Sequence, residues 1–484
     1  MIGWDGADHA TVEGWTRDGM LPHLASLRGR GVHGTLTGYP GLGDDTCWGS
    51  FATGTGPGTH GRFHHRQIVP TTYREDNFFR DRMAGTAFWS QVGDAGRRVA
   101  ILDVPKSPLA KDLNGIQLAD WLSHGADGPV PVSWPPSLAS ELPARFHVSE
   151  EFDCDRLRSG INDLADCRAH VREHLALRSE LILDWMGRED WDLLLAVFAE
   201  SHCIGHHCWH LHDPRHPEHD KDASRFIGDP VLEIHQALDT SLGRIVSACG
   251  DDAIVIVFSL LGMGANFSGN WLANSVLKKL EAHLPMSPPG LSHLAASARR
   301  YADRLLHRKA PAPLDEHASR RAFVLHSDGP NTAIRLNLVG REPNGTIAPS
   351  DYAVCSKFIA ESFLALTDPD DGRPIVSHVI PVADRHRGPH ATAYADLLIV
   401  WRNDAPIRGA SSLATGIIDD TPPIDRTGNH RHGGWFVAAG EGLAPNPNNN
   451  AATIVDLAPT IAAFLDVKLN GMEGVPIAAL SVRT

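Results

Sequence analysis

The strongest constraint on the fold comes from short segments that are apolar throughout. Three of them, at 97–105 (RRVAILDVP), 191–198 (WDLLLAVF) and 251–264 (DDAIVIVFSLLGMG), have the length of strands, and a fourth lies at 394–401 (YADLLIVW). Continuous apolar runs of this length are typical of strands that are buried on both faces. Because amphipathic helical patterns separate the runs, the sequence predicts an α/β fold with a mostly parallel central sheet and helices on both faces.

Two stretches interrupt this alternation of strands and helices. Residues 130–190 mix Pro-rich loop with a helical pattern, and residues 262–393 contain helical segments and a short β segment, NTAIRLNLVGREP. We therefore expect a core made of residues 1–261 and 394–484. We expect a helical or loop insertion at 130–190, inside the first part of this core. We also expect an inserted cap at 262–393, between its two parts.

Bulk composition narrows the class of protein. The chain has 484 residues, 42% of them hydrophobic and 21% charged, and a formal net charge of −14, which is typical of an acidic globular protein. The acidic balance argues against a nucleic acid polymer or a membrane as partner. Seven scattered cysteines without a CxxC pair, and an N-terminus unlike a signal peptide, predict a cytoplasmic location. We expect a small-molecule substrate, and the sequence leaves an oligomer open.

Polar residues directly follow several of the predicted strands. Asp5 follows MIGW, and His202 and His206 follow LLLAVF. Loops beyond the carboxyl ends of parallel strands meet at one edge of the sheet and form ligand sites there. His202 and His206 are four residues apart, so one helical turn would place both imidazoles on the same face. This pattern predicts a metal site, whereas we expect mostly surface or cleft positions for the neighbouring His207, His210, His212, His216 and His219.

A series of ordered motifs carries a resemblance that runs nearly end to end. The motifs are IGWDG, LPHLASLRGRGV, WGSFATGTGPGTHG, AIRLNLVGREPNGTI, GPHATAYADLLIVW, TGNHRHGGWFVAAG and VDLAPTIAAFLDV. Together they resemble the type I phosphodiesterase/nucleotide pyrophosphatase family of the alkaline phosphatase superfamily. The resemblance implies an alkaline phosphatase-like fold and hydrolysis of phosphate monoesters or diesters, or of sulfate esters as in sister families. It also implies a pair of metal ions, usually zinc, that stabilise the charge developing in the transition state.

The resemblance also implies which residues bind metal. Asp5 occupies the position of the first-strand ligand. His206 matches the histidine of an Asp-x-x-x-His motif, in which His202 here replaces the aspartate. His430, in TGNHRHGG, matches the distant histidine of the same metal site, and His432 is the alternative for that position.

The remaining positions of the family's site are altered in this chain. The nucleophile position falls on Asp44, and Thr46 is the nearest hydroxyl, so we expect a catalytic role for Asp44 or Thr46, while metal-bound water stays open as the nucleophile. Asp44 equally suits a helix cap at this place. The family's second Asp-His pair falls on Leu260 and Leu261, which cannot bind a metal ion. Asp5 and Asp44 alone would therefore hold a second ion only weakly.

These substitutions favour one tightly bound ion over two. Three neutral imidazoles suit a divalent metal, zinc first, with iron or manganese as alternatives. We therefore expect a metal-dependent hydrolase of a phosphate ester, phosphodiester or sulfate ester, with one metal per chain. Two alternatives remain. The scaffold could serve another metal-assisted reaction, such as a transferase, lyase or bond-forming biosynthetic step, or it could be a non-catalytic pseudoenzyme. The glycines of GTGPGTHG do not form a nucleotide-binding motif, so we expect no other cofactor site.

Overall fold

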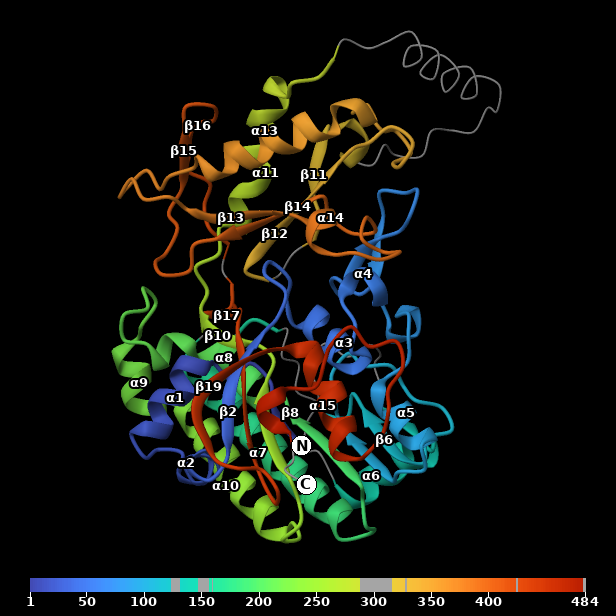
Figure 1. Cartoon of the computed structure of the whole chain (residues 1–484). Coiled ribbons are helices and arrows are strands. Elements are labelled where there is room, and N and C mark those ends of the chain that lie inside the picture. Colours follow the sequence, from blue (N-terminus) through green and yellow to red (C-terminus); the bar gives the residue numbers. More distant parts are fainter. Residues whose placement is uncertain are drawn as a thin grey trace.

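Two lobes make up the described part of the chain, as Figure 1 shows. The larger lobe is built on a nine-stranded sheet, and the smaller lobe above it on a four-stranded sheet. This computed structural model describes residues 1–122, 131–146, 156–158, 160–287, 316–326, 329–423 and 425–481.

The large sheet confirms the predicted fold class. Its strand order is β19-β2-β18-β9-β1-β8-β5-β6-β7, and most neighbours run parallel. Within the described part of this sheet, the antiparallel pairs are β18 with β2, β18 with β9, and β7 with β6. The strands are β1 (Ile2–Trp4), β2 (Val32–Thr37), β5 (Val99–Leu102), β6 (Gly115–Ala119), β7 (Val132–Trp134), β8 (Leu193–Phe198), β9 (Val255–Ser259), β18 (Gly434–Ala439) and β19 (Asn446–Thr453).

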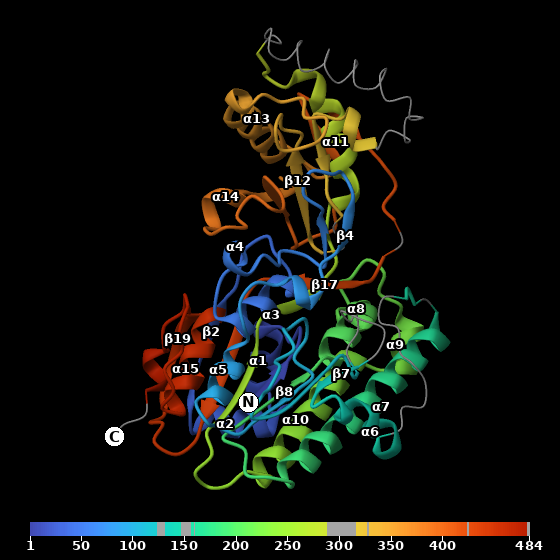
Figure 2. The ribbon, with the colours of Figure 1, turned by 90° about the vertical axis from the view of Figure 1, so that its right-hand side faces the viewer.

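Helices cover both faces of this sheet, which explains why its central strands are apolar throughout. In β5, Ala100 and Leu102 pack into one apolar core, and Val99 and Ile101 pack into the other. Figure 2 shows α7, α8 and α10 on one side of the sheet and α5 and α15 on the other. The covering helices are α1 (His9–Arg17), α2 (Pro22–Gly29), α7 (Ile161–Met186), α8 (Glu200–His212) and α10 (Pro230–Ala248) on one face, and α3 (Asp44–Thr53), α5 (Phe88–Asp94) and α15 (Leu457–Phe464) on the other.

The segment expected as an insertion at 130–190 contributes to this helical layer. It contains β7, α6 (Ser137–Arg145) and α7. Helix α7 packs against α8 and α10 and buries Val171 and Leu175 in the main core. No helix in the described ranges is both long enough and apolar enough to cross a membrane.

The smaller lobe corrects one strand assignment. The apolar run at 394–401, expected in the central sheet, forms β14 (Leu397–Trp401) in the four-stranded sheet instead. That sheet has the order β11-β12-β14-β13, and all its neighbours are antiparallel. An inner strand of either sheet is buried on both faces, so hydrophobicity alone could not tell the two sheets apart. The other elements of this lobe are β11 (Ala322–Val324), β12 (Asn331–Leu336), β13 (Val376–Pro381), α11 (Ala273–Leu280), α13 (Tyr352–Leu364) and α14 (Val382–Arg385).

A short strand pair lies between the two lobes. β10 (Gly262–Ala265) pairs antiparallel with β17 (Gly428–Arg431), with Met263 opposite His430. β10 begins where the predicted cap begins, and β17 lies in the returning chain, although the domain boundaries themselves stay a prediction. The remaining short elements are α4 (Pro57–His60), α9 (Lys221–Ile227), β3 (Arg66–Ile68), β4 (Glu75–Asn77), β15 (Ala410–Ser412) and β16 (Gly416–Ile418).

Candidate metal centre

Helix α8 carries the first two histidines of the site. It begins at Glu200, two residues after the end of β8, and Ser201 anchors its first turn by donating a hydrogen bond from Oγ to the backbone oxygen of Asp5 (2.7 Å). His202 and His206 lie one turn apart on this helix, and both are buried. The predicted helical turn and the shared face of the two imidazoles are therefore present.

Close packing of glycines brings the third histidine to the same place. A Cβ atom at Gly428 would lie 2.0 Å from the backbone oxygen of Gly205, so β17 can approach α8 this closely only with glycine at 428. The backbone oxygen of Gly428 accepts a hydrogen bond from Nδ1 of His206 (2.8 Å). Two residues later, His430 faces the same space.

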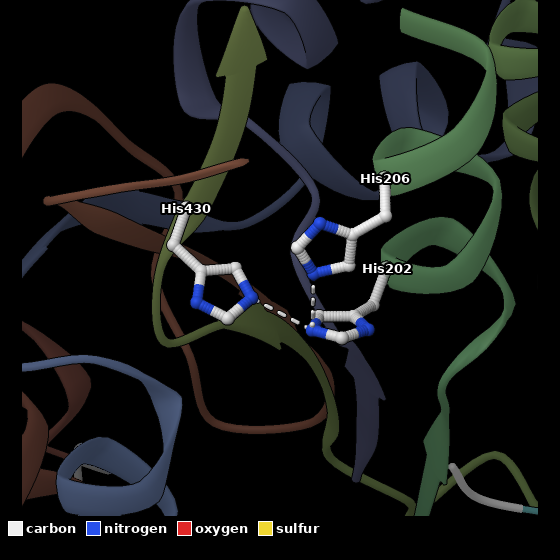
Figure 3. A group of neighbouring side chains, drawn as sticks. All are labelled: His202, His206 and His430. Atoms are coloured by element: carbon white, nitrogen blue, oxygen red, sulfur yellow. Dashed lines mark hydrogen bonds between the residues drawn. The ribbon is translucent and has the colours of Figure 1, made fainter. Parts of the chain in front are cut away.

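The three imidazoles converge on one point, as Figure 3 shows. Nε2 of His202 lies 2.7 Å from Nε2 of His430 and 3.2 Å from Nε2 of His206. Figure 3 also shows that His202 and His206 project from one helix and His430 from the strand opposite. One ligand atom from each residue lies within 4.8 Å of the others, close enough to hold one metal ion.

The protonation pattern fits a cation at this point. Because the oxygen of Gly428 can only accept, Nδ1 of His206 carries the proton, and its neutral ring leaves Nε2 as a lone-pair acceptor. Ligand nitrogens around a tetrahedral zinc ion lie about 3.3 Å apart. The His202–His206 distance already matches, and His202 and His430 need to separate by only about 0.6 Å. The three nitrogens therefore fit one divalent metal ion.

A charged cluster lies next to the histidines. Asp44, the first residue of α3, has its Oδ1 atom 3.6 Å from Nδ1 of His430. Nζ of Lys106 donates to Oδ2 of Asp44 (2.6 Å) and lies 3.4 Å from Oδ1 of Asp45. Arg62, which is fully buried, donates to the same Asp45 oxygen through Nη2 (2.9 Å).

The charges of this cluster fix its ionisation states. Burial alone would raise the pKa of Asp44, but the nearby positive charge, that of Lys106 above all, outweighs it and lowers the pKa to about 2. Burial alone would likewise lower the pKa of Lys106, but Asp44 and Asp45 raise it above its ordinary value. Lys106 and both carboxylates are therefore charged at neutral pH.

A cavity of about 110 Å³ joins the histidines to the charged cluster. Its wall includes His202, His206 and His430 as well as Asp44, Asp45 and Lys106. The smaller lobe and nearby loops complete the wall with His64, His65, Asn331, Tyr394, Leu398 and Arg426. A substrate group in this cavity would touch both the candidate metal centre and the buried ammonium of Lys106.

The other predicted site residues lie outside this wall. The carboxylate of Asp5 stays at the end of β1, where Oδ1 accepts a hydrogen bond from the indole Nε1 of Trp48 (3.1 Å). The hydroxyl of Thr46 is fully buried and donates to the backbone oxygen of Phe63 (2.9 Å). Neither residue lines the cavity or joins a metal-capable group within the described ranges.

Leu260 and Leu261 line a second, much smaller cavity, which His430 also lines. Both side chains are buried, with 1% and 3% exposure. They bring apolar surface to the place where the resemblance implies an Asp-His pair.

His432 lies away from the three histidines. Its Nε2 accepts a hydrogen bond from the backbone N–H of Gly41 (3.1 Å), and burial lowers its pKa to about 4. This contact favours His430 over His432 as the third ligand.

The neighbouring histidines were expected mostly at the surface or in a cleft. His207 and His210 on α8 are buried, and Nδ1 of His210 pairs with Oγ1 of Thr427 (2.9 Å). His216, beyond the end of α8, is buried too but lines a separate cavity. Helix α8 lies between β10 and β17 on one side and α7 and α10 on the other, so it has almost no exposed face.

Among the charged and imidazole side chains of the cavity wall, Lys106, His64 and His65 were not predicted, whereas Asp45 shares with Asp44 the expectation of a helix cap or a catalytic role. Lys106 follows β5, one of the apolar runs that the sequence revealed, so the rule that polar groups gather beyond strand ends could have found it. His64 and His65 lie between α4 and β3, where no pattern marks them. Together with Asp45 they form a second group of close metal-binding atoms, but Arg62 and Lys106 already neutralise that carboxylate.

Solved structures of known proteins share this fold. The phosphonoacetate hydrolase of Sinorhizobium meliloti 1021, in complex with phosphonoformate, is 14% identical with a TM-score of 0.50, and the match covers 94% of this chain and 93% of that one. Human ectonucleotide pyrophosphatase/phosphodiesterase 5 is 12% identical with a TM-score of 0.51, and the match covers 98% of this chain and 96% of that one. The inactive murine counterpart in complex with AMP has the same identity, TM-score and coverage of both chains. At such identities the likeness concerns the fold alone, and a comparison with curated protein sequences found no match.

A sequence model of one protein family spans most of the chain. It matches residues 1–398, which include the two α8 histidines, Asp44 and Lys106, but end before His430. The chain therefore belongs to the type I phosphodiesterase/nucleotide pyrophosphatase family, a family of phosphoric ester hydrolases.

Proposed function

We propose that the protein is a metal-dependent phosphoric ester hydrolase that acts on a small-molecule phosphodiester or phosphate monoester. One divalent ion, zinc first, would be held by His202, His206 and His430. The convergence of their three imidazole nitrogens, within 4.8 Å of one another on the wall of a cavity, carries the proposal. The same geometry leaves sulfate esters as a third class to test.

Family membership favours hydrolysis over the two alternatives, another metal-assisted reaction and a protein without turnover. Two related folds bind small molecules, AMP in the murine phosphodiesterase and phosphonoformate in the phosphonoacetate hydrolase. A small substrate also suits a cavity of about 110 Å³ better than a polymer does. The cytoplasmic location stays a prediction.

The bound ion would supply a Lewis acid for one phosphoryl oxygen. The chain's own residues then prepare the site around it. Gly428 fixes the tautomer of His206, so that Nε2 faces the ion. Asp44 lies beside Nδ1 of His430 and stabilises this ring in the same way, as a carboxylate next to a ligating histidine does.

Asp44 is also the side chain best placed to attack phosphorus. It lines the cavity, stays ionised at neutral pH and begins helix α3, whose N-terminal backbone N–H groups favour negative charge. In the proposed reaction a carboxylate oxygen of Asp44 forms a bond to phosphorus, and the ester oxygen leaves with its electron pair. Water then cleaves the resulting aspartyl phosphate and regenerates Asp44.

The test combines metal content with turnover. We expect about one divalent ion per chain by elemental analysis, as suits a three-histidine set. That ion should be lost in His202→Ala and kept in His212→Ala, a matched variant on the same helix that pairs with Asp229 away from the cavity. Bis(p-nitrophenyl) phosphate, p-nitrophenyl phosphate and p-nitrophenyl sulfate distinguish the three ester classes.

The nucleophile is tested separately. Acid quenching during turnover should trap a phosphorylated protein that hydroxylamine cleaves, and Asp44→Asn should abolish both the adduct and turnover. Turnover in Asp44→Asn at the rate of the wild type would exclude Asp44 as nucleophile. Absence of bound metal together with absence of turnover on all three esters would overturn the proposed function itself.

A further inference from the structure

Lys106 brings a buried ammonium to the wall of the cavity that the three histidines also line. Its side chain is 10% exposed and contacts Asp44 (2.6 Å) and Asp45 (3.4 Å). An ammonium group carries three N–H donors. Among the described residues, Asp44 accepts a hydrogen bond from one of these donors and Asp45 lies at ion-pair distance, so a donor remains for a ligand in the cavity.

The loop that carries Lys106 is held in an unusual conformation. Asp103 and Lys106 both have positive φ angles, 56° and 53°, which side chains with a Cβ rarely adopt. Contacts outside the cavity fix this loop. Asp103 accepts hydrogen bonds from the backbone N–H groups of Trp121 (2.9 Å) and Leu122 (3.0 Å) and pairs with Arg178. Strained backbone that the surroundings enforce in this way is concentrated at functional sites.

The carboxylates of this cluster already have their cations. Lys106 faces Asp44, and Arg62 donates to Asp45 through both Nε (3.2 Å) and Nη2 (2.9 Å). A divalent ion at these carboxylates would have to displace a buried ammonium or guanidinium group. Doing so would leave that cation buried without its partner, which is costly.

The neighbouring positions offer no better place for a second ion. Leu260 and Leu261 present only apolar atoms beside His430. Asp5 accepts the indole hydrogen bond of Trp48 and lies outside the cavity wall. Positive charge close to a bound phosphoryl group must therefore come from side chains in addition to the single ion at the histidines.

We propose that Lys106 is a phosphate-binding residue of this site, which holds Asp44 with one N–H and donates another to a non-bridging oxygen of the substrate's phosphoryl group. It thereby supplies the charge that a second metal ion would otherwise supply, and the site works with one ion. This inference rests on the proposed function. It adds that the phosphoryl group lies between the three histidines and Lys106.

Inorganic phosphate is the probe, and isothermal titration calorimetry of the metal-loaded full chain is the measurement. Lys106→Met should weaken phosphate binding by at least about tenfold, since it removes one charge-assisted hydrogen bond. Metal content should stay at about one ion per chain, because three histidine ligands remain. Lys111→Met is the matched control, because Lys111 is exposed on the same connection and should bind phosphate as the wild type does.

Lys106→Met leaves two buried carboxylates close together, so a second pair of variants guards against misfolding. Asp44→Asn, which removes one of the two carboxylates beside Lys106, serves as the background, and its own affinity for phosphate is the reference. Adding Lys106→Met to Asp44→Asn should again weaken binding by at least about tenfold, now without an unpaired charge at position 44. A circular dichroism melt confirms that each variant is folded.

The outcomes separate this inference from the proposed function. One ion per chain, with phosphate binding unchanged by Lys106→Met in both backgrounds, overturns the role of Lys106 and leaves the hydrolase intact. Two ions per chain in the wild type also overturn the role of Lys106, because a second metal ion would then supply the positive charge beside the phosphoryl group. No ion and no phosphate binding in the wild type overturn both.

Discussion

His202 and His430 are 228 positions apart in the chain, yet their Nε2 atoms lie 2.7 Å apart. One residue belongs to the helix that follows a central strand, and the other to the strand pair between the two lobes. With Nε2 of His206 only 3.2 Å from that of His202, a single shared proton cannot satisfy all three nitrogens. A metal cation can accept a lone pair from all three nitrogens. The packing of β17 against α8, which brings them together, is therefore the structural basis of the candidate metal centre.

The first prediction distinguishes the two histidines of the TGNHRHGG segment. His430→Ala should remove most of the bound metal and lower kcat/KM by at least about 100-fold, because two imidazoles alone hold zinc weakly. His432→Ala should keep the metal, since His432 accepts from the backbone of Gly41 and not from the cluster. Elemental analysis of both variants checks this. Loss of metal in His432→Ala with retention in His430→Ala would reverse the assignment.

The second prediction concerns Thr46, the nearest hydroxyl to the family's nucleophile position. Thr46→Val should retain turnover within about threefold of the wild type, because the hydroxyl faces the oxygen of Phe63 and not the cavity. The variant should lose about 1–2 kcal/mol of unfolding free energy, since that oxygen loses a buried donor. Steady-state kinetics and urea denaturation measure the two effects. A fall in kcat of several orders of magnitude in a folded variant would identify Thr46 as the nucleophile.

Local sequence pattern predicted the parts of the structure that depend on local burial. The apolar runs at 97–105, 191–198 and 251–264 all supply strands of the central sheet, β5, β8 and β9. The run at 394–401 was placed in the wrong sheet, because being buried on both faces does not reveal which strands are the neighbours. Strand pairing is a long-range property that the hydrophobic pattern of one segment does not encode.

The residues of the site show the same difference between local pattern and long-range packing. The i, i+4 spacing and the strand-end position indicated His202 and His206, and the resemblance added His430; the structure brings these three together, while their role as metal ligands stays a prediction. The strand-end rule could have indicated Lys106, but the positive φ angles of Asp103 and Lys106 in that loop follow no local pattern. Asp5 was expected as a ligand from its strand-end position and from the resemblance, whereas its carboxylate accepts a hydrogen bond from Trp48, on a helix 43 positions away.

The third prediction tests what holds α8 in place. Arg178 is buried between Asp103 and Glu200, the first residue of α8, and its side chain is 1% exposed. Arg178→Met should lower the free energy of unfolding by about 3–5 kcal/mol, because two carboxylates are left buried without their cation. Guanidinium denaturation measures this change.

Arg172→Met, on the same helix α7, is the control for that experiment. Arg172 pairs with Glu233 at the surface, where its side chain is 55% exposed, so its loss should cost at most about 1 kcal/mol. Equal destabilisation by the two variants would show that the Arg178 cluster has no special role in holding α8.

The last prediction concerns pH and His60, which follows the glycine-rich loop. His60 is fully buried, its Nδ1 accepts from the N–H of Arg62 (3.1 Å), and its Nε2 faces Oγ of Ser50 (2.9 Å). Burial lowers its pKa from 6.5 to about 3. Between these two values the unfolded chain binds more protons than the folded one, so stability is fully present above pH 6.5 and falls as the pH falls toward 3. One such group contributes at most about 1.4 kcal/mol per pH unit, or about 2 kcal/mol between pH 6.5 and 5.

His60→Gln removes this titration while its amide can still donate to Ser50. The variant should therefore be less stable than the wild type at pH 7, yet lose less stability on going to pH 5, by up to about 2 kcal/mol. His283→Gln, at an exposed position, should leave the slope unchanged because that imidazole meets water in both states. Urea denaturation at several pH values between 5 and 7.5 gives the three slopes. Equal slopes for His60→Gln and the wild type would mean that His60 becomes protonated within the folded protein. In that case the hydrogen bond that Nδ1 of His60 accepts from Arg62 could not persist below pH 6.5.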